Sequence, residues 1–308
     1  MGGTVYTADA WKSYASASSA KPIFTTFTST RVHPDLDPKE VYRESRDSAI
    51  HPKSRLLVLC PDLTGSMGFL SKALVDKDLG ETFEQVISRS KAGELFSDPH
   101  VMVMGLGDVE AGDQGPLQVT QAEADPVTLA TQCEKIWIEG HGGGNMFESY
   151  HLPWYFAATH ISMDCWDKRG KKGYLFTIGD EPPPHTLYAK HIEQVIGTKQ
   201  STDLSIAEVL DMASQKFEVF HIIIGEGQHA RSRPDDVRNA WQLVLGQRAL
   251  WLSDHTKLAE LVVSTIQINE GIDKDEVIKS WDGDTAVVIA SATKNMMKTP
   301  TTSGVVRF

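Results

Sequence analysis

The sequence has few cysteines, no long apolar run and too few basic residues to balance its acidic ones. Its three cysteines, Cys60, Cys133 and Cys165, are odd in number and far apart, which indicates neither a disulfide framework nor a thiolate metal site. No apolar run approaches the roughly 20 residues that span a bilayer. Residues 1–21 also lack the apolar segment of a signal peptide. We therefore expect a cytoplasmic protein with reduced thiols and no membrane partner.

The shortage of basic residues also limits the choice of partner. The formal net charge is -11, and nucleic acids and anionic lipids are held largely by Lys and Arg, so nonspecific binding to either is disfavoured. The basic run at residues 168–172 is an exception, and we interpret it as a solvated turn before a strand that starts at Tyr174. We expect no nucleic-acid partner.

Two compositional zones divide the chain. Residues 1–50 are rich in Ser, Thr and Ala and carry isolated aromatic residues, so this segment buries little by itself. It forms either a mobile arm or a strap across the main domain. Residues 51–308 form that main domain together with a carboxy-terminal extension, and the chain's hydrophobic content of 41% is ample for a core.

From Arg55 onward, short apolar segments alternate with amphipathic ones. Strands are predicted at residues 56–60, 101–106, 174–178, 217–224 and 286–290, with a weaker candidate at 249–252. Helical patterns occupy residues 68–88, 123–138, 147–161, 186–196, 205–216, 234–246 and 257–268. This alternation predicts an α/β fold with a doubly wound, mostly parallel central sheet and helices on both faces.

The most informative motif follows the first predicted strand. The apolar run at residues 56–60 indicates a strand covered on both faces, and Asp62, Thr64 and Ser66 then follow at alternate positions. Ligands of such sheets bind beyond the carboxyl ends of the strands, where these three side chains are expected to lie. A carboxylate at the end of a buried strand is costly unless it is paired. The motif therefore predicts a divalent-cation loop.

Other polar residues are expected at the same edge of the sheet. Asp180 ends a later predicted strand and is followed by Glu181. A glycine-rich loop at residues 141–145 ends in Asn145 and opens the helical segment that carries Glu148. Because the carboxyl ends of parallel strands share one edge of the sheet, oxygens from these separate segments can converge on one point.

The chemistry of these side chains favours a hard ion. Asp, Thr, Ser and Asn offer oxygen ligands, and no Cys or His lies in the loops at useful spacing, so Mg²⁺ is favoured over Zn²⁺, with Mn²⁺ or Ca²⁺ as alternatives. Asp62 and Asp180 together balance a dication and leave a coordination position to water or an incoming group. A carboxylate from a partner could fill that position, so the ion would bridge two proteins without any bond being made or broken.

These residues carry a family resemblance. The loop of Asp62, Thr64 and Ser66, the glycine-rich loop and Asp180 resemble the metal-ion-dependent adhesion site of von Willebrand factor type A domains. The resemblance implies that the first three are ligands from the first loop and that Asp180 is the aspartate of the third. The middle loop of the family usually supplies a threonine, where this chain has Asn145. Either Asn145 substitutes for it, a water does, or the site is incomplete.

The resemblance covers roughly residues 55–225 and implies a binding module and not a catalyst. Intracellular bacterial and viral members of the family commonly work beside ATPases or within larger assemblies. A protein partner that presents an acidic residue is therefore implied, within an assembly of that kind.

Ordinary structural roles compete with these interpretations. Ser66 or Thr64 can cap the helix that is predicted to follow them. Asp108 and Asp113, in a glycine-rich segment after the second strand, are typical of turn residues. His221 lies in an apolar strand, where most histidines are satisfied core residues.

An enzyme is the alternative class of function. Ser66, Asp180 and His221 or His229 follow the chain order of an α/β-hydrolase triad, and residues 141–144 resemble an oxyanion loop. Against this, the first position of the nucleophile elbow is not glycine. The His-Gly-Gly-Gly element also follows the serine, whereas hydrolases place it before.

A Mg²⁺-dependent phosphatase with Asp62 as the nucleophile is a second enzyme alternative. That chemistry needs another carboxylate two residues further on as the general acid, and Thr64 cannot serve. Between the two classes, we predict an interaction module without enzymatic activity.

Overall fold

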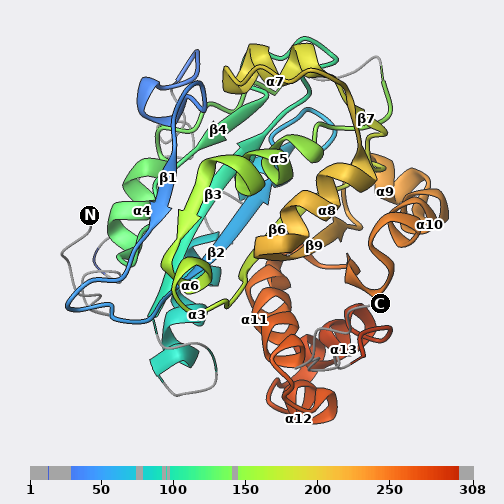
Figure 1. The fold of residues 1–308 in the computed structure, drawn as a ribbon. Helices are drawn as coiled ribbons and strands as arrows, with labels where there is room; N and C mark the ends of the chain where they lie inside the picture. Colours follow the sequence, from blue (N-terminus) through green and yellow to red (C-terminus); the bar gives the residue numbers. More distant parts are fainter. Residues whose placement is uncertain are drawn as a thin grey trace, which may run out of the picture.

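A six-stranded sheet forms the centre of the molecule (Figure 1). The computed structural model describes residue 13 and residues 29–73, 79–91, 95, 98–140 and 145–297. The strand order is β10-β9-β6-β2-β3-β4, with β4 antiparallel to β3 and every other pair parallel. The strands are β2 (Ser54–Pro61), β3 (Asp98–Leu106), β4 (Leu117–Val119), β6 (Gly173–Gly179), β9 (Phe217–Ile224) and β10 (Ala249–Leu252).

Helices cover both faces of this sheet (Figure 1). One face is covered by α2 (Phe69–Ala73), α3 (Leu79–Lys91), α4 (Pro126–Cys133), α11 (Leu258–Asn269), α12 (Lys274–Lys279) and α13 (Gly283–Ala292). The other is covered by α5 (His151–His160), α7 (Ala189–Ile196), α8 (Ile206–Lys216), α9 (Gln228–Ser232) and α10 (Pro234–Leu245). This arrangement confirms the predicted α/β doubly wound fold.

The apolar run of β2 explains its central position. Leu57 and Leu59 pack into the core on one side of the sheet, while Leu56, Val58 and Cys60 pack into the core on the other. All five side chains are completely buried. A strand buried on both faces needs a continuous apolar sequence, and this requirement is why β2 was recognisable.

The segment before β2 lies against the main domain. Its short strand β1 (Arg43–Ser45) pairs in parallel with β5 (Ile161–Met163), and the 3-10 turn η2 (Pro34–Leu36) buries Leu36 in the core. Residues 29–50 thus run as a strap across the domain, one of the two predicted alternatives. The rest of the Ser/Thr-rich segment, apart from residue 13, lies outside the described residues. The division of the chain at residue 50 stays a prediction.

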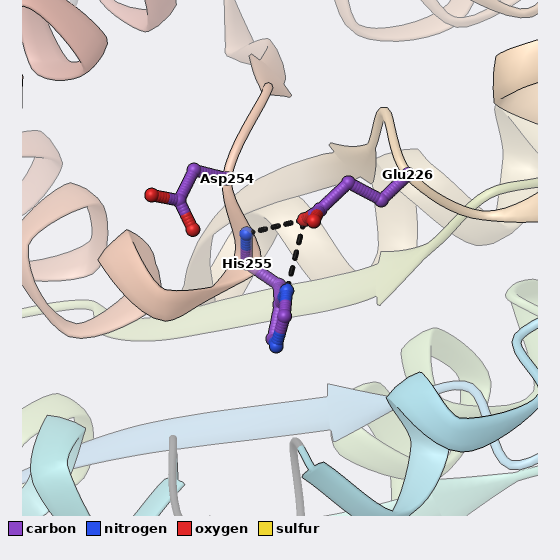
Figure 2. A group of neighbouring side chains, drawn as sticks. All are labelled: Glu226, Asp254 and His255. Atoms are coloured by element: carbon purple, nitrogen blue, oxygen red, sulfur yellow. Dashed lines mark hydrogen bonds and ion pairs between the residues drawn. The ribbon is translucent and has the colours of Figure 1, made fainter.

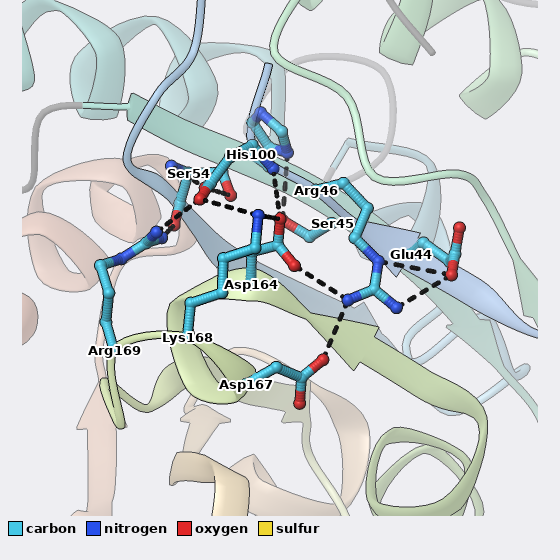
Figure 3. A network of polar contacts seen from close by, with 10 residues as sticks. Glu44, Ser45, Arg46, Ser54, His100, Asp164, Asp167, Lys168 and Arg169 are labelled. Atoms are coloured by element: carbon cyan, nitrogen blue, oxygen red, sulfur yellow. Dashed lines mark hydrogen bonds and ion pairs between the residues drawn. The ribbon is translucent and has the colours of Figure 1, made fainter.

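A group of ion pairs fastens this strap, and we call it the ion-pair cluster (Figure 3). It consists of six charged residues: Arg46, Asp47, Asp164, Asp167, Lys168 and Arg169. The Arg46 guanidinium donates to Asp164 and Asp167 at 2.9 Å each, and Arg169 donates to Asp47 at 2.6 Å. Asp164, in α6 (Asp164–Asp167), and the two basic residues that follow this helix therefore hold the strap through charge. Part of the basic run at residues 168–172 is thus paired and not simply solvated.

One predicted strand is wrong. Residues 286–290 lie in helix α13 and not in the sheet, which ends at β10. Val287 is 68% exposed while Ile289 is buried, the one-sided burial of a surface helix. A short apolar run cannot be assigned to strand or helix by periodicity alone. Within the predicted helix at 68–88, the described helical parts are α2 and the beginning of α3.

Several short elements were not predicted. Besides β1, β4 and β5, they include β7 (Thr186–Leu187) and β8 (Leu204–Ser205), which form a two-stranded ribbon beside α7 and α8, and the turns η4 (Gly246–Arg248) and η5 (His255–Lys257). The three cysteines are buried, free thiols, as expected. Across the described part of the chain, no helix combines the length and apolar character needed to cross a membrane.

Candidate metal centre

The order of the strands places the candidate site. Along the chain, the central sheet begins with β2. Strands β3 and β4 are then added on one side of β2, and β6, β9 and β10 on the other side. The direction therefore reverses between β2 and β6, and in doubly wound sheets ligands bind outside the carboxyl ends of the strands at this switch point. Asp62 directly follows β2 and Asp180 directly follows β6.

Three donors hold the carboxylate of Asp62, which is completely buried. Its Oδ1 accepts hydrogen bonds from the Thr64 backbone N–H at 2.8 Å and the Thr64 hydroxyl at 2.6 Å. Its Oδ2 accepts from the Tyr150 hydroxyl at 2.8 Å. The two bonds to Thr64 bend the chain sharply after β2, so the next hydroxyl returns to the edge of the sheet.

A chain of hydrogen bonds joins Asp62 to Asp180. The Oγ1 of Thr64 lies 3.3 Å from the Oγ of Ser66, which donates to Asp180 Oδ1 at 2.9 Å. The other oxygen of Asp180 accepts from the His229 backbone N–H at 2.8 Å. Asp62, Thr64, Ser66 and Asp180, four of the five predicted ligands, are therefore brought together.

Asn145, the fifth predicted ligand, contacts a different residue. Its side-chain amide donates to Asp108 Oδ2 at 2.5 Å. Asp108 in turn accepts from the Glu110 backbone N–H, and its own N–H donates to Asp113, so both aspartates act as turn residues. The glycine-rich loop at residues 141–144 lies outside the described residues.

Two further carboxylates lie at the site, and sequence reasoning did not assign them a role. Glu148 is 3% exposed and Glu181 is 4% exposed, and the Oε2 of each has no hydrogen-bond partner among the described residues. The Oε1 of Glu181 lies 2.7 Å from the His229 ring. Each acid closely follows a predicted ligand in the sequence, and this position was the one signal that could have identified it. We call Asp62, Glu148, Asp180 and Glu181 the acidic cluster.

Burial and mutual repulsion shift the protonation of the acidic cluster. Burial, with the charge of Asp180, raises the pKa of Asp62 to about 7. Burial and the charges of Asp62 and Asp180 raise the pKa of Glu181 to about 8. Burial, followed by the charges of Asp62 and Glu181, raises the pKa of Glu148 to about 12, and burial raises that of Asp180. The cluster therefore holds its charge poorly unless a cation joins it.

In the described part of the structure, basic side chains do not neutralise the acidic cluster. There, no Lys or Arg forms an ion pair with the acidic cluster, and the His229 ring contacts it through Glu181. Two neutral hydroxyls, from Thr64 and Ser66, lie between the carboxylates instead. Hard oxygen donors at this density suit Mg²⁺, Mn²⁺ or Ca²⁺. The buried, unpartnered oxygens of Glu148 and Glu181 are a second indication that the residues present fit a divalent cation.

Two glycines allow the loops to approach these carboxylates. A Cβ on Gly179 would lie 2.0 Å from the Tyr150 hydroxyl oxygen and 2.9 Å from Asp62 Oδ2. A Cβ on Gly227 would lie 2.2 Å from the Cβ of Asp180. Any larger residue at either position would push the acidic cluster apart.

The geometry does not form the triad of a hydrolase. Ser66 donates directly to Asp180, whereas a serine nucleophile would donate to a histidine. The His229 ring pairs with Glu181. The His221 ring bonds the Thr177 hydroxyl at 2.9 Å and stacks on Trp241, so it is a core histidine as expected, although its Nε2 has no hydrogen-bond partner among the described residues.

The geometry is also unsuited to a phosphatase with Asp62 as nucleophile. Both oxygens of Asp62 already accept hydrogen bonds from Thr64 and Tyr150. The position of the general acid is occupied by the hydroxyl of Thr64, as the sequence indicated.

A second group of possible ligands lies after β9 and β10 (Figure 2). Glu226, Asp254 and His255 each offer one atom within 4.8 Å of the others. Their contacts have local explanations: Glu226 Oε2 accepts from the backbone N–H of His255 and lies 2.9 Å from its ring, and Asp254 caps the turn η5 through Thr256. These residues are only partly buried, and nothing at this group matches the unpartnered oxygens of the acidic cluster.

Comparison with known proteins yields structural likeness alone. No family model matches the sequence, and none of the curated proteins matches it. The pilus adhesin SpaC from Lactobacillus rhamnosus GG, in an open conformation, aligns with a TM-score of 0.48 and 12% identity over 77% of this chain and 31% of the adhesin. A von Willebrand factor type A protein from Catenulispora acidiphila aligns with a TM-score of 0.36 and 13% identity over 79% of this chain and 51% of that protein.

Proximal thread matrix protein 1 from the mussel byssus, with a zinc-occupied MIDAS motif, aligns with a TM-score of 0.39 and 9% identity over 74% of this chain and 49% of that protein. The chain thus spans about a third to a half of the length of the proteins that it resembles. At TM-scores below 0.5 these alignments carry no weight for function. The fold class is defined by the observed strand order and the two helical layers.

Proposed function

We propose that this protein is a non-enzymatic interaction module whose binding depends on a divalent cation. Asp62, Thr64, Ser66 and Asp180 would hold the ion, with Mg²⁺ favoured and Mn²⁺ or Ca²⁺ as alternatives. The observation that carries the proposal is a buried group of carboxylates at the switch point of the sheet, joined through two hydroxyls and lacking a Lys or Arg partner among the described residues.

Each residue has a distinct task in this proposal. The carboxylates of Asp62 and Asp180 supply negative charge from two different loops, and the hydroxyls of Thr64 and Ser66 supply neutral oxygens between them. Tyr150 fixes the orientation of the Asp62 carboxylate. The bound ion would supply an electrophilic position for a carboxylate from outside.

The loop after β2 is partly accessible to solvent. Gly65 is exposed and Ser66 is partly exposed, whereas Asp62 and Thr64 of the same loop are buried. An acidic side chain of a protein partner could reach the ion along this side, and the ion would bridge it to Asp180 and Asp62. The net charge of -11 supports a protein partner over a nucleic acid. We place this binding in the cytoplasm, within a larger assembly that can include an ATPase.

Thermal unfolding of chelator-treated protein tests the metal dependence. Mg²⁺ or Mn²⁺ should raise the melting temperature, because an ion that binds only the folded state stabilises it. Asp62→Ala should abolish this rise, whereas Asp254→Ala, in the group of Figure 2, should retain it. A rise that survives Asp62→Ala would contradict the proposal, as would labelling of Ser66 by a fluorophosphonate probe.

Capture of partner proteins with and without chelator tests the interaction. A protein retained in Mg²⁺ should be lost on chelation and with Ser66→Ala, and substitution of one Glu or Asp on that partner should have the same effect. Binding that ignores both chelation and Ser66→Ala would mean that the protein uses another face.

A further inference from the structure

A carboxylate occupies the place where the expected middle-loop ligand is missing. We propose that Glu148, and not Asn145, supplies the ligand from the segment before α5, so that the centre has an all-oxygen set with three loops contributing carboxylates. This inference rests on the proposed function, since it names a ligand of the same site.

The backbone that directly follows Glu148 is held in place. The Ser149 backbone N–H donates to the Gly107 carbonyl at 3.3 Å, and the Ser149 hydroxyl accepts from the Val109 N–H at 3.0 Å. One residue further on, the Tyr150 hydroxyl reaches Asp62 Oδ2. Glu148 is therefore positioned by contacts that its own side chain does not make.

The side chain of Glu148 is buried without adequate partners. It is 3% exposed, and its Oε2 has no hydrogen-bond partner within the described ranges. Its charge is repelled most strongly by that of Asp62 and then by those of Glu181 and Asp108. Leaving a buried carboxylate in such surroundings is costly, so a bound cation explains its position better than a structural role.

Asn145 is directed elsewhere. Its amide nitrogen donates to Asp108 Oδ2, and Asp108 is itself fixed by the turn after β3. Asn145 thus stabilises the turn that flanks the site, and its partly exposed side chain lacks the burial of Glu148.

A carboxylate in this position changes the charge of the loaded site. With Asp62, Asp180 and Glu148 all ionised around one dication, the site keeps a net negative charge, whereas a neutral ligand would leave it balanced. The ion should be held more tightly, because each anionic ligand adds Coulomb attraction in a buried setting.

Mn²⁺ binding by the chelator-treated full chain, measured by calorimetry and electron paramagnetic resonance, tests the inference. Glu148→Gln should weaken Mn²⁺ binding at least about tenfold, by comparison with the effect of losing a supporting group. The same variant should not lower the melting temperature of the metal-free protein, because Gln has the shape of Glu and brings no charge that a cation must balance. A purely structural role would instead lower that temperature. Glu148→Asp should recover part of the affinity, and Asn145→Ala should bind Mn²⁺ like the parent.

The outcomes separate this inference from the proposed function. Parent protein that does not bind Mn²⁺ would overturn both. Parent-like binding by Glu148→Gln, or loss of binding in Asn145→Ala with Glu148→Gln unaffected, would overturn the inference and leave the proposed function standing. Should Glu148→Gln fail to fold, the Glu148→Asp variant decides: Mn²⁺ affinity identical to the parent would contradict a direct role for a carboxylate at this distance.

Discussion

The molecule contains two groups of carboxylates that are neutralised in opposite ways. In the ion-pair cluster, each carboxylate has an Arg or Lys partner at 2.6 to 2.9 Å (Figure 3). In the acidic cluster, Asp62, Glu148, Asp180 and Glu181 face one another with three hydroxyls and one histidine ring nearby. The first group is complete as it stands, whereas the second needs a positive charge from outside.

The pKa directions express the same difference. The hydrogen bond from Arg169 lowers the pKa of Asp47, and the pKa of Asp164 is lowered because Lys168 and Arg46 overcome the effect of burial. Burial raises the pKa of Asp62 to about 7. Acidic residues alone therefore do not identify an ion site, and the presence or absence of basic partners distinguishes a structural cluster from a binding one.

The largest expected difference between the two clusters is their response to metal. At Mn²⁺ concentrations about a hundredfold above the dissociation constant, the free energy of unfolding should rise by about 3 kcal/mol. Asp180→Asn should lose most of this rise, and Asp164→Asn should keep all of it, because the ion-pair cluster has no share in the site. Urea unfolding with and without Mn²⁺ measures both. If both variants lose the Mn²⁺-dependent rise equally, the two clusters do not differ in metal binding as proposed.

The pH dependence of the metal-free protein should have opposite slopes for the two clusters. Asp62 and Glu181, whose pKa values are raised to about 7 and about 8, take up protons on folding. Their contribution is therefore greatest below about pH 4 and is lost as the pH rises to about 8.

Asp47 and Asp164 have lowered pKa values, so their contribution is present above about pH 4 and is lost as the pH falls further. Urea unfolding in chelator from pH 3 to 9 gives the full profile. Asp62→Asn should reduce the loss of stability that occurs as the pH rises from about 4 to about 8. Asp164→Asn should reduce the loss of stability that occurs below about pH 4. A profile in which Asp62→Asn alters only the acidic part would contradict the sign of the shift.

Removing an acid from the ion-pair cluster should destabilise the fold. Asp164→Asn leaves Arg46 and Lys168 without a buried carboxylate and should lower the free energy of unfolding by about 1 to 2 kcal/mol, since both basic partners are partly exposed. The matched control is Asp167→Asn, whose side chain is 46% exposed and whose loss should cost less than about 0.5 kcal/mol. Chemical denaturation at pH 7 compares them. Equal losses of stability in the two variants would mean that the burial of a carboxylate does not determine its contribution to stability.

The smallest expected effect is at the edge of the acidic cluster. Tyr150→Phe removes the hydroxyl that donates to Asp62 Oδ2 and should cost about 1 kcal/mol of stability in Mn²⁺. The aromatic packing of Tyr150 against Trp241 is retained, so this loss isolates the hydroxyl. Thermal unfolding of the Mn²⁺-loaded protein measures it. If the stability of the Mn²⁺-loaded variant equals that of the parent, the Asp62 carboxylate does not depend on this donor.

Most of the central sheet could be predicted from the sequence. Strands β2, β3, β6, β9 and β10 carry the continuous apolar runs of buried parallel strands. Asp62 and Asp180 were recognisable because each follows such a run directly, at the edge where ligands bind. Their proximity then followed from the alternation of strands and helices, which implied a doubly wound sheet.

The other elements and several contacts at the site could not be predicted from the sequence. Strand β4 has three residues at the antiparallel edge, too few to show a period, and the run at 286–290 fits a helix as well as a strand. The roles of Glu148 and Tyr150 depend on where side chains point in an irregular segment, and no periodicity governs that direction. Asn145 was favoured by its place after the glycines, but its contact with Asp108 depends on the conformation of another loop.

Anomalous diffraction from crystals grown with Mn²⁺ would locate the ion itself. We expect an anomalous peak between the hydroxyls of Thr64 and Ser66 and the carboxylate of Asp180, at the carboxyl ends of β2 and β6. A peak confined to Glu226, Asp254 and His255 (Figure 2), with none beside Ser66, would contradict this expectation.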